Sequence, residues 1–310
     1  MRNGWCLIWV LFSVQVLTVS ATEQASQHFS YRFNHNQQPY LLEFSLPADS
    51  ISQHFRNFRR FQPQLFERYI WRDLQQHAAA YAQVKLQPGP SSQRLKFTVH
   101  SSDTAVAEQL RQELTTLTTQ RWQHYLQQEY YYQMAFPTGQ QVFIPDHPTI
   151  MQQSTAALQP VAAALQQHLT DKTPRETAAF ISSWIQQIPY HPLADRHQGS
   201  GFNPPLKILT ENRGDCDSKA VLLAALLQIL LPEQQTVIIY LPEHAMLGIA
   251  LEPEDIQSTD ENIRLDGVTY TLLDPTGPAL LQPGEITPEH RIYTRNSHVA
   301  WRIMSAVPAD

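Results

Sequence analysis

The spacing of apolar and polar residues changes along the chain, and its most apolar stretch is the run Ala220–Leu231. Strong helix formers fill this run until Pro232, and apolar residues occupy nearly every side of the predicted helix. We therefore expect the fold to enclose it. Cys216 lies just before the run, where Asp215 or Asp217 can cap free N–H groups. Those N–H groups and the helix dipole favour a thiolate, so the pattern predicts a reactive cysteine at the mouth of a buried helix.

Apolar residues also fill strands that follow this helix. The run Thr236–Leu241 is typical of a buried strand, and a second strand is predicted over His244–Leu251. A polar, acidic loop separates it from a third strand, Val268–Asp274. If the second and third strands pair antiparallel, the start of one lies beside the end of the other. Strand polarity alone then brings His244 and Asp274 together.

A cysteine, a histidine and an aspartate are the set that cysteine-dependent acyl transfer needs. A thiolate attacks, an imidazole moves the proton, and a carboxylate holds the imidazole in its working tautomer. Each residue also has an ordinary structural explanation, as inert packing, a core histidine or a turn. Taken together, in this order and on these elements, Cys216, His244 and Asp274 predict catalysis.

Three short motifs carry a family resemblance. They are Gly214-Asp215-Cys216-Asp217 heading an apolar helix, Glu243-His244-Ala245 opening a strand, and Leu273-Asp274-Pro275-Thr276 closing the next strand. They are similar to the core motifs of the bacterial transglutaminase-like superfamily, over roughly residues 173–284 of this chain. The resemblance implies a papain-like fold in which these motifs supply the catalytic triad.

The resemblance also suggests roles for residues around the nucleophile. The helix and loop before the cysteine help to form the cleft in this superfamily, which makes Tyr190 and Asn203 candidates for substrate binding or oxyanion stabilisation. Some periplasmic members bind calcium through acidic residues that flank the nucleophile, and Asp215 and Asp217 occupy comparable positions. Because this chain has Ser218 where the more acidic motif has a third acidic residue, helix capping and calcium binding both stay open. No other cofactor is required.

The expected reaction is hydrolysis of a peptide or isopeptide bond in an envelope protein. Cross-linking needs a site that holds an amine and excludes water, and the sequence has no acidic or aromatic tunnel motif for that purpose. Two alternatives remain: a protein cross-linking transglutaminase, and a catalytically inactive transglutaminase-like module that binds a peptide or an envelope component. Rapid reaction of Cys216 with iodoacetamide at neutral pH would favour an enzyme.

Composition sets further bounds. The chain has 310 residues, of which 42% are hydrophobic and 16% charged, and a net charge of −6. This is ordinary for a globular protein of one large or two smaller domains, and the acidic balance argues against nucleic acid as a partner.

The first residues predict export. Trp5–Leu17 is an apolar core behind Arg2, and Val19-Ser20-Ala21 fits a cleavage site, so residues 1–21 are expected to be a signal peptide. The expected location is therefore periplasmic or secreted. Of the two cysteines, Cys6 lies in this segment, so the mature protein would keep Cys216 alone.

Residues 22–148 are expected to form a small N-terminal α+β domain with its linker, and residues 149–310 the transglutaminase-like domain. The N-terminal predictions are a hairpin over His28–Leu46, a helix over Phe55–Val84 broken near Pro63, a strand over Arg94–His100, and a helix over Asp103–Tyr132. The linker is predicted at Phe136–Pro148, followed by helices over Ser154–Leu169 and Pro174–Ile188 and a loop over Tyr190–Pro205 that leads to the cysteine helix. The overall class is α+β.

One dense basic cluster stands out in the N-terminal part. It is Arg56-Asn57-Phe58-Arg59-Arg60-Phe61, with Arg68 and Arg72 beyond it. Such a cluster is usually a solvated helix face. The alternative is a docking surface for an acidic partner or for membrane headgroups, which would give the N-terminal domain an envelope or membrane-surface partner.

Overall fold

The structure is a computed structural model that describes residues 25–89, 95–193, 201–295 and 299–304. The predicted signal peptide lies outside these residues. No helix in the described part of the chain has the length and apolar character that crossing a membrane requires.

The helices are α1 (Ala48–Gln53), α2 (Pro63–Ala78), α3 (Thr104–Gln128), α4 (His147–Gln166), α5 (Pro174–Gln186), α6 (Pro205–Glu211), α7 (Cys216–Leu230) and α8 (Pro288–Arg295), with a 3-10 turn at Pro253–Asp255. The strands are β1 (Ser26–His35), β2 (Gln38–Pro47), β3 (Val84–Pro88), β4 (Phe97–Ser101), β5 (Tyr131–Ala135), β6 (Gln141–Pro145), β7 (Thr236–Leu241), β8 (His244–Ile249), β9 (Asn262–Leu265), β10 (Val268–Leu273) and β11 (Ala300–Ile303). The predicted α+β class is confirmed.

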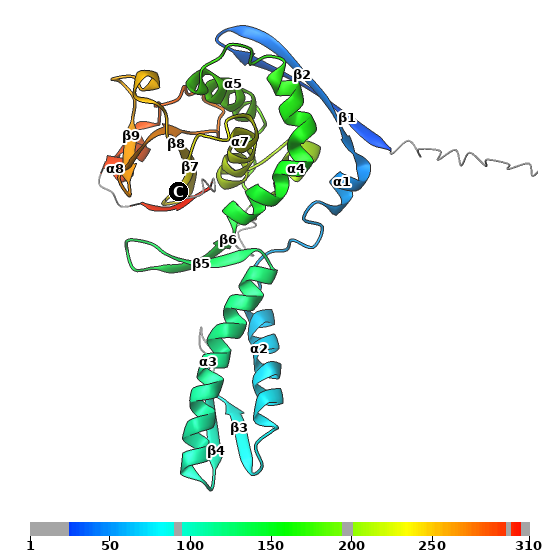
Figure 1. Cartoon of the computed structure of the whole chain (residues 1–310), viewed down its shortest axis with the longest axis vertical. Coiled ribbons are helices and arrows are strands. Elements are labelled where there is room, and N and C mark those ends of the chain that lie inside the picture. The colour runs from blue at the N-terminus through cyan, green and yellow to red at the C-terminus, as the bar shows by residue number, and fades with distance from the viewer. Residues whose placement is uncertain (1–24, 90–94, 194–200, 296–298, 305–310) are drawn as a thin grey trace, which may run out of the picture.

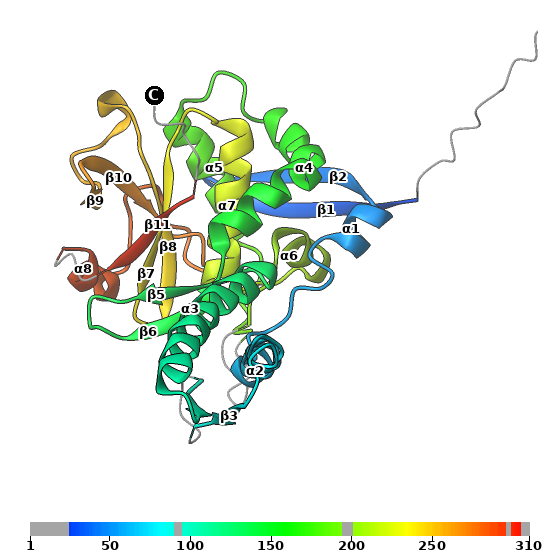
Figure 2. The same cartoon turned by 60° about the horizontal axis from the view of Figure 1, so that its bottom comes forward.

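A five-stranded antiparallel sheet in the order β11-β7-β8-β10-β9 forms the centre of the larger body (Figures 1 and 2). Alternate residues of β7 face opposite sides. Ile238 and Tyr240 join the cluster that includes α4, α5 and α7, whereas Val237 and Ile239 join a second cluster on the other face. Because both faces are covered, every residue of β7 is buried, which explains why its sequence is continuously apolar rather than alternating.

Helix α7 is enclosed, as its composition predicts. Its residues from Ser218 to Leu227 are buried, and its contacts include α4, α5, α6 and β8. It begins at Cys216, four residues before the predicted apolar run, because the Asp215 side chain caps the N–H of Ser218.

The predicted N-terminal hairpin is confirmed as β1–β2. Asn36 and Gln37, between paired residues His35 and Gln38, both have positive φ, as a tight two-residue hairpin turn requires. The hairpin packs on α4 and α5 (Figure 2), where Phe33 contacts the ring of Phe180 edge-on. It therefore shares the core of the C-terminal elements, although it precedes them by more than a hundred residues.

Helices α2 and α3 with the ribbon β3–β4 form a separate projection, which we call the arm (Figure 1). Ile70 and Leu74 of α2 meet Leu110 and Leu114 of α3, each pair one turn apart on its helix, and together they make a small cluster of their own. The predicted break at Pro63 is the start of α2, but residues 55–62 are not helical. The predicted N-terminal domain contains both the hairpin, which packs on α4 and α5, and the arm, which has a cluster of its own. The division of the chain at residue 148 therefore stays a prediction.

Several predicted boundaries were wrong. The predicted linker at Phe136–Pro148 contains β6 and the first residues of α4, which begins at His147 because Pro148 suits a first helical turn. Helix α3 ends at Gln128, and the tyrosines after it enter β5. The predicted loop over Tyr190–Pro205 does not lead directly to the cysteine helix, because α6 intervenes and ends at Asn212 in the left-handed conformation.

Candidate active site

Cys216 is the first residue of α7, and its side chain is half-buried. The thiol accepts a hydrogen bond from the backbone N–H of Ala245, the residue that follows His244 at the start of β8. The helix start and the strand start therefore meet at the sulfur atom.

The surroundings of the thiol differ from the sequence-based expectation. Burial raises the pKa of Cys216 well above that of a free cysteine, and the carboxylates of Asp217 and Asp215 raise it further. The hydrogen bond from Ala245 acts in the opposite direction but is weaker. The expected easy formation of a thiolate was therefore wrong for the resting protein, because the prediction weighed the helix terminus without burial or the adjacent acids.

This pKa predicts slow alkylation of the resting thiol. At pH 7, Cys216 should react with iodoacetamide more slowly than free N-acetylcysteine, and its rate should still be rising above pH 9, because only the thiolate reacts. Mass spectrometry of the alkylated peptide measures the rate, with Cys216→Ala reporting labelling at Cys6. Labelling faster than that of the free thiol at pH 7 would contradict the expectation.

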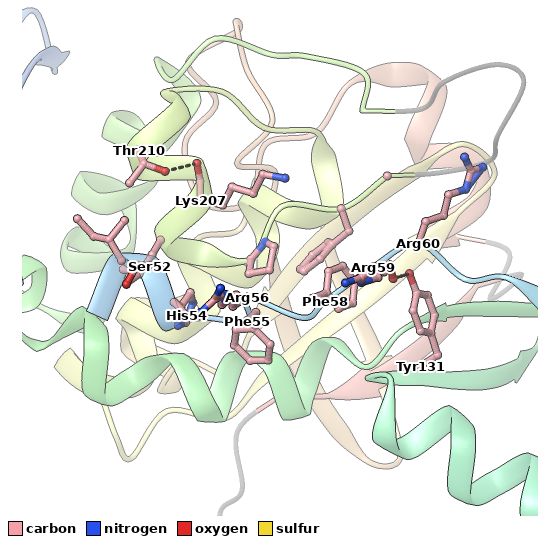
Figure 3. Close-up of a pocket in the computed structure, with 15 residues that line it drawn as sticks. Ser52, His54, Phe55, Arg56, Phe58, Arg59, Arg60, Tyr131, Lys207 and Thr210 are labelled. Carbon is pink, nitrogen blue, oxygen red and sulfur yellow. Dashed lines mark hydrogen bonds between the residues drawn. The ribbon is translucent and has the colours of Figure 1, made fainter. Parts of the chain in front are cut away.

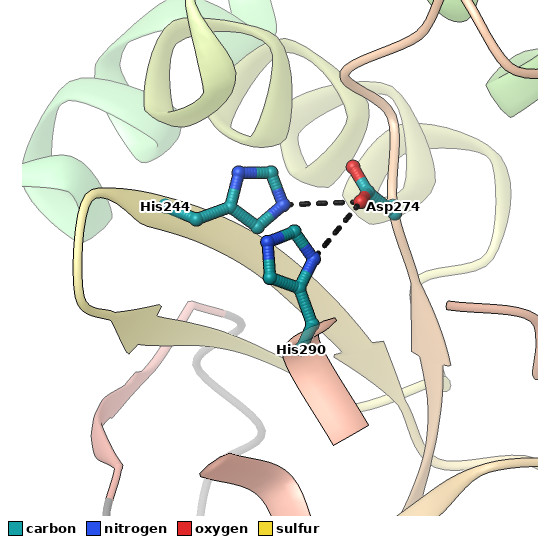
Figure 4. A group of neighbouring side chains, drawn as sticks. All are labelled: His244, Asp274 and His290. Atoms are coloured by element: carbon teal, nitrogen blue, oxygen red, sulfur yellow. Dashed lines mark hydrogen bonds and ion pairs between the residues drawn. The ribbon is translucent and has the colours of Figure 1, made fainter. Parts of the chain in front are cut away.

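His244 and Asp274 come together as strand polarity predicts. Strands β8 and β10 pair antiparallel, with Leu247 opposite Leu273. The Nε2 atom of His244 lies 3.0 Å from Oδ2 of Asp274 (Figure 4). The Asp274 carboxylate is 6% exposed and also accepts the N–H of Thr276 at 3.0 Å.

The charge of this pair follows from its contacts. Burial alone would raise the pKa of Asp274, but hydrogen bonds from His244 and Thr276 outweigh burial and lower it. The carboxylate is therefore ionised at neutral pH and accepts a hydrogen bond from Nε2–H of His244, so the tautomer that this bond selects has a free lone pair on Nδ1. Such an imidazole can act as a base through Nδ1.

A second imidazole, absent from the sequence-based prediction, completes the cluster. The ring of His290, from α8, stacks on that of His244 with centroids 4.1 Å apart and planes 12° apart. Its Nδ1 lies 3.9 Å from Oδ2 of Asp274 and 3.1 Å from Oγ1 of Thr287. Burial, followed by the nearby His244, lowers the pKa of His290 and keeps it neutral. No local motif around His290 marks it, since its place depends on the packing of α8.

Among the described residues, His244, Asp274 and His290 form a group that could hold a metal ion, because their nitrogen and oxygen ligand atoms lie within 4.8 Å of one another. Two imidazoles and a carboxylate are ligands that zinc accepts. However, both ring nitrogens converge on the same carboxylate oxygen, and the rings are nearly parallel (Figure 4). In this arrangement Nε2 of His244 donates its proton to that oxygen, so a zinc ion could bind Nε2 only by displacing the proton.

Asp215 and Asp217 form a second acidic feature beside Cys216. Both carboxylates accept the N–H of Ser218, at 3.3 and 2.9 Å. Burial and then the neighbouring Asp217 raise the pKa of Asp215 to about 8, and burial also raises the pKa of Asp217. Asp217 further contacts Nε2 of His147 at 3.3 Å, and burial lowers the pKa of that imidazole to about 3, so it stays neutral.

Calcium fits this pair only in part. The ion takes about six to eight oxygen ligands, and the pair supplies two carboxylates. Within the described ranges, no third acidic or histidine side chain joins Asp215 and Asp217 as a ligand group. The other ligands would have to be backbone carbonyl oxygens or water.

The two predicted substrate-binding residues lie in different surroundings. Tyr190 pairs with Gly214 in a short parallel bridge, and its side chain is 49% exposed. Burial, followed by the negative charges of Cys216 and the two aspartates, raises its pKa, which places it beside the nucleophile. Asn203, in contrast, is 2% exposed and directs its amide toward Glu211 at 3.5 Å. Its backbone N–H donates to Oγ of Ser218, so it supports α7 and does not face a substrate.

Lys219 connects the nucleophile helix to the strand end that carries Asp274. Its side chain is fully buried, and Nζ donates to the backbone oxygens of Ile188 at 2.5 Å and Thr276 at 2.6 Å. Burial lowers its pKa to about 8. A lysine directly before the apolar run Ala220–Leu227 of a buried helix was the sequence signal that could have identified it.

Comparisons with known proteins find a distant structural likeness and no match by sequence. No family model and no curated protein matches the chain. Solved structures of Legionella pneumophila LapG match 44% of this chain. The EGTA-treated form is 16% identical over 73% of its own chain with a TM-score of 0.29, and the calcium-bound form is 15% identical over 76% with a TM-score of 0.28. Values of this size do not assign the chain to a family.

Proposed function

We propose that this protein is a cysteine-dependent hydrolase that cleaves a peptide or isopeptide bond in a protein of the cell envelope. Two contacts at the start of β8 support the proposal. The Cys216 thiol lies against the start of β8, and the first residue of β8, His244, is held by the ionised Asp274.

In the proposed reaction, Nδ1 of His244 takes the thiol proton as Sγ of Cys216 forms a bond to the carbonyl carbon of the substrate. The raised pKa of the thiol favours proton transfer at the moment of attack over a standing thiolate. The backbone N–H of Cys216, at the helix start, stabilises the oxyanion. His244 then protonates the leaving amine, the C–N bond breaks, and a thioester remains.

Water completes the cycle. His244 removes a proton from a water molecule, the resulting hydroxide attacks the thioester, and the thiolate leaves and regains the proton. Asp274 stays ionised throughout and stabilises the imidazolium. Tyr190, beside the nucleophile and half-exposed, is the residue that we assign to the substrate-binding wall.

Loss of the thiol should abolish the reaction. With an envelope-protein extract or casein as substrate, Cys216→Ala is expected to show no cleavage above background, because the covalent step needs Sγ. Thr115→Ala, at an exposed position of α3, is the control and should cleave as wild type does. Electrophoresis with mass spectrometry follows the products, and circular dichroism checks the fold. Full activity of Cys216→Ala would refute the proposal, and inactivity of wild type toward peptides and amine donors alike would favour a binding module.

The location is part of the same proposal. Support comes from residues 1–21, whose apolar core and small residues predict a cleaved signal peptide. A periplasmic or secreted enzyme would meet envelope proteins, which is the substrate class proposed here.

We also propose that Asp215 and Asp217 bind calcium. The two carboxyl groups are adjacent, burial and the charge of Asp217 raise the pKa of Asp215 to about 8, and a divalent cation would favour ionisation of both. A bound ion would supply positive charge beside the thiol. Cleavage itself needs no step through the ion.

Calcium binding can be measured without activity. After dialysis against EGTA, addition of saturating calcium should raise the melting temperature of Cys216→Ala by about 5 °C. In the Cys216→Ala background, the shift should be absent when Asp217→Asn is added. It should be present when Asp255→Asn is added as the matched control, because Asp255 lies in the 3-10 turn Pro253–Asp255. A shift that survives Asp217→Asn, or no shift in any protein, would leave helix capping as the role of the pair.

A further inference from the structure

An open pocket of about 440 Å³ lies between the segment after β2 and the start of α6 (Figure 3). Its volume is within the range of about 300–1,000 Å³ that is common for ligand sites. The cationic side chains of its lining are Arg56, Arg59, Arg60 and Lys207, and its aromatic side chains include Phe55, Phe58, Tyr131 and Phe202. We call it the basic pocket.

The basic pocket concentrates positive charge in an acidic protein. The chain has a net charge of −6, yet no aspartate or glutamate is among the described residues that line the pocket. In the part of the chain that the structure describes, no carboxylate pairs with Arg56 or Arg59, and Lys207 reaches Glu211 only at 3.9 Å. A concave surface of one sign focuses its field and attracts the opposite charge.

The walls of the pocket are preformed by aromatic packing. The ring of Phe58 stacks on Tyr131 with centroids 5.6 Å apart, and meets Phe202 edge-on at 5.7 Å. Phe55 has a φ of 48°, in the left-handed region that bulky residues avoid, and its ring packs edge-on against Tyr130 at 4.9 Å. Strain of this kind persists where the surrounding packing holds it, and it occurs preferentially at binding sites.

The floor of the pocket leads to the candidate active site. Phe202 precedes Asn203, whose backbone N–H bonds Oγ of Ser218 at 2.8 Å, two residues after the nucleophile. The Phe202 ring also lies 5.0 Å from that of His147, which contacts Asp217 at 3.3 Å. Phe202 therefore lines the pocket and also lies next to residues that contact the start of α7.

We propose that the basic pocket binds an acidic segment of the polypeptide substrate, next to the segment that enters the active site. The proposal rests on the proposed function in that the bound polypeptide is the substrate. Guanidinium groups match carboxylates with two parallel hydrogen bonds, and the exposed side chains of Arg56 and Arg59 suit aspartate and glutamate side chains on a peptide.

Binding can be tested without catalysis. Fluorescence anisotropy would measure the affinity of Cys216→Ala for a fluorescein-labelled oligoglutamate peptide, with the matching oligoglutamine peptide as probe control. Adding Arg56→Glu and Arg59→Glu is expected to weaken binding of the glutamate peptide at least about tenfold, and raised salt should weaken it in the parent protein. The matched control is Arg68→Glu with Arg72→Glu, which makes the same charge change on exposed positions of α2. That control should bind within about twofold of the parent.

The outcomes separate the two proposals. Equal binding of the two peptides, or equal loss in the pocket and control variants, would overturn the pocket proposal. The proposal would also be overturned if the parent protein bound phosphatidylglycerol vesicles but not the glutamate peptide, and if the pocket variant lost the vesicle binding. That result would assign the pocket to a membrane surface. Because the assay uses Cys216→Ala, a failure of the proposed hydrolysis leaves this measurement unaffected. Melting curves of each variant confirm that the fold is retained.

Discussion

Replacing Asp274 with asparagine is expected to lower kcat about 10³- to 10⁴-fold, whereas His244→Ala should remove turnover altogether. The asparagine keeps the shape of the carboxylate but carries no charge to stabilise the imidazolium. Its amide can also donate a hydrogen bond to Nε2 of His244, which moves the ring proton to Nδ1. Nδ1 would then be unable to accept the thiol proton.

The measurement is kcat under saturating substrate, for the cleavage that wild type performs. Asp266→Asn is the matched control, because it makes the same chemical change in the exposed turn between β9 and β10, where asparagine also tolerates the positive φ of 46°. It should keep full activity. If Asp274→Asn retained more than about a tenth of wild-type kcat, the carboxylate would have no role in orienting His244.

Replacing Lys219 with methionine is expected to lower the free energy of unfolding by about 3 kcal/mol. The substitution keeps the apolar stem but leaves the backbone oxygens of Ile188 and Thr276 buried without a donor. Removing a buried ammonium also recovers its desolvation cost, but the orphaned carbonyl groups remain and outweigh that gain. Urea unfolding measures the change. Lys207→Met, at an exposed position of α6, should stay within about 0.5 kcal/mol of wild type.

The pH dependence of stability gives an independent check on Lys219. Its pKa is about 8 in the folded protein and 10.5 in an unfolded chain, so between these values the unfolded state holds more protons. Stability from this group therefore rises as pH increases from 8 to 10.5. Relative to wild type, Lys219→Met should lack that rise. If the free energy of unfolding of wild type and of Lys219→Met changed by the same amount between pH 8 and 10.5, Lys219 would not have the lowered pKa that its burial implies.

The sequence was sufficient where short-range rules and strand polarity decide the structure. The continuous apolar run predicted the buried strand β7, and the antiparallel polarity of β8 and β10 predicted that His244 lies beside Asp274. Likewise, the hairpin predicted over His28–Leu46 is present as β1–β2, and the apolar composition of α7 predicted its burial.

The sequence was insufficient where tertiary packing decides. His290 reaches His244 only because α8 folds back beside the sheet, and nothing in its local sequence encodes that approach. The pKa of Cys216 depends on how deeply the fold buries the thiol, which a helix-terminus argument does not include. Strand β9 lies in a polar segment and forms because β10 offers an unpaired edge, so its own propensity gave little signal.

The arm has a thermodynamic consequence. Its cluster around Ile70 and Leu110 is distinct from the two clusters that cover the central sheet, and among the described residues only the small cluster of Phe66, Leu126 and Tyr131 joins the arm to the larger body. The arm and the sheet therefore share only a small part of the packing that makes unfolding cooperative. Differential scanning calorimetry should then resolve two transitions rather than one. A single Tm would describe neither unit, and Lys219→Met should move only the transition that belongs to the sheet.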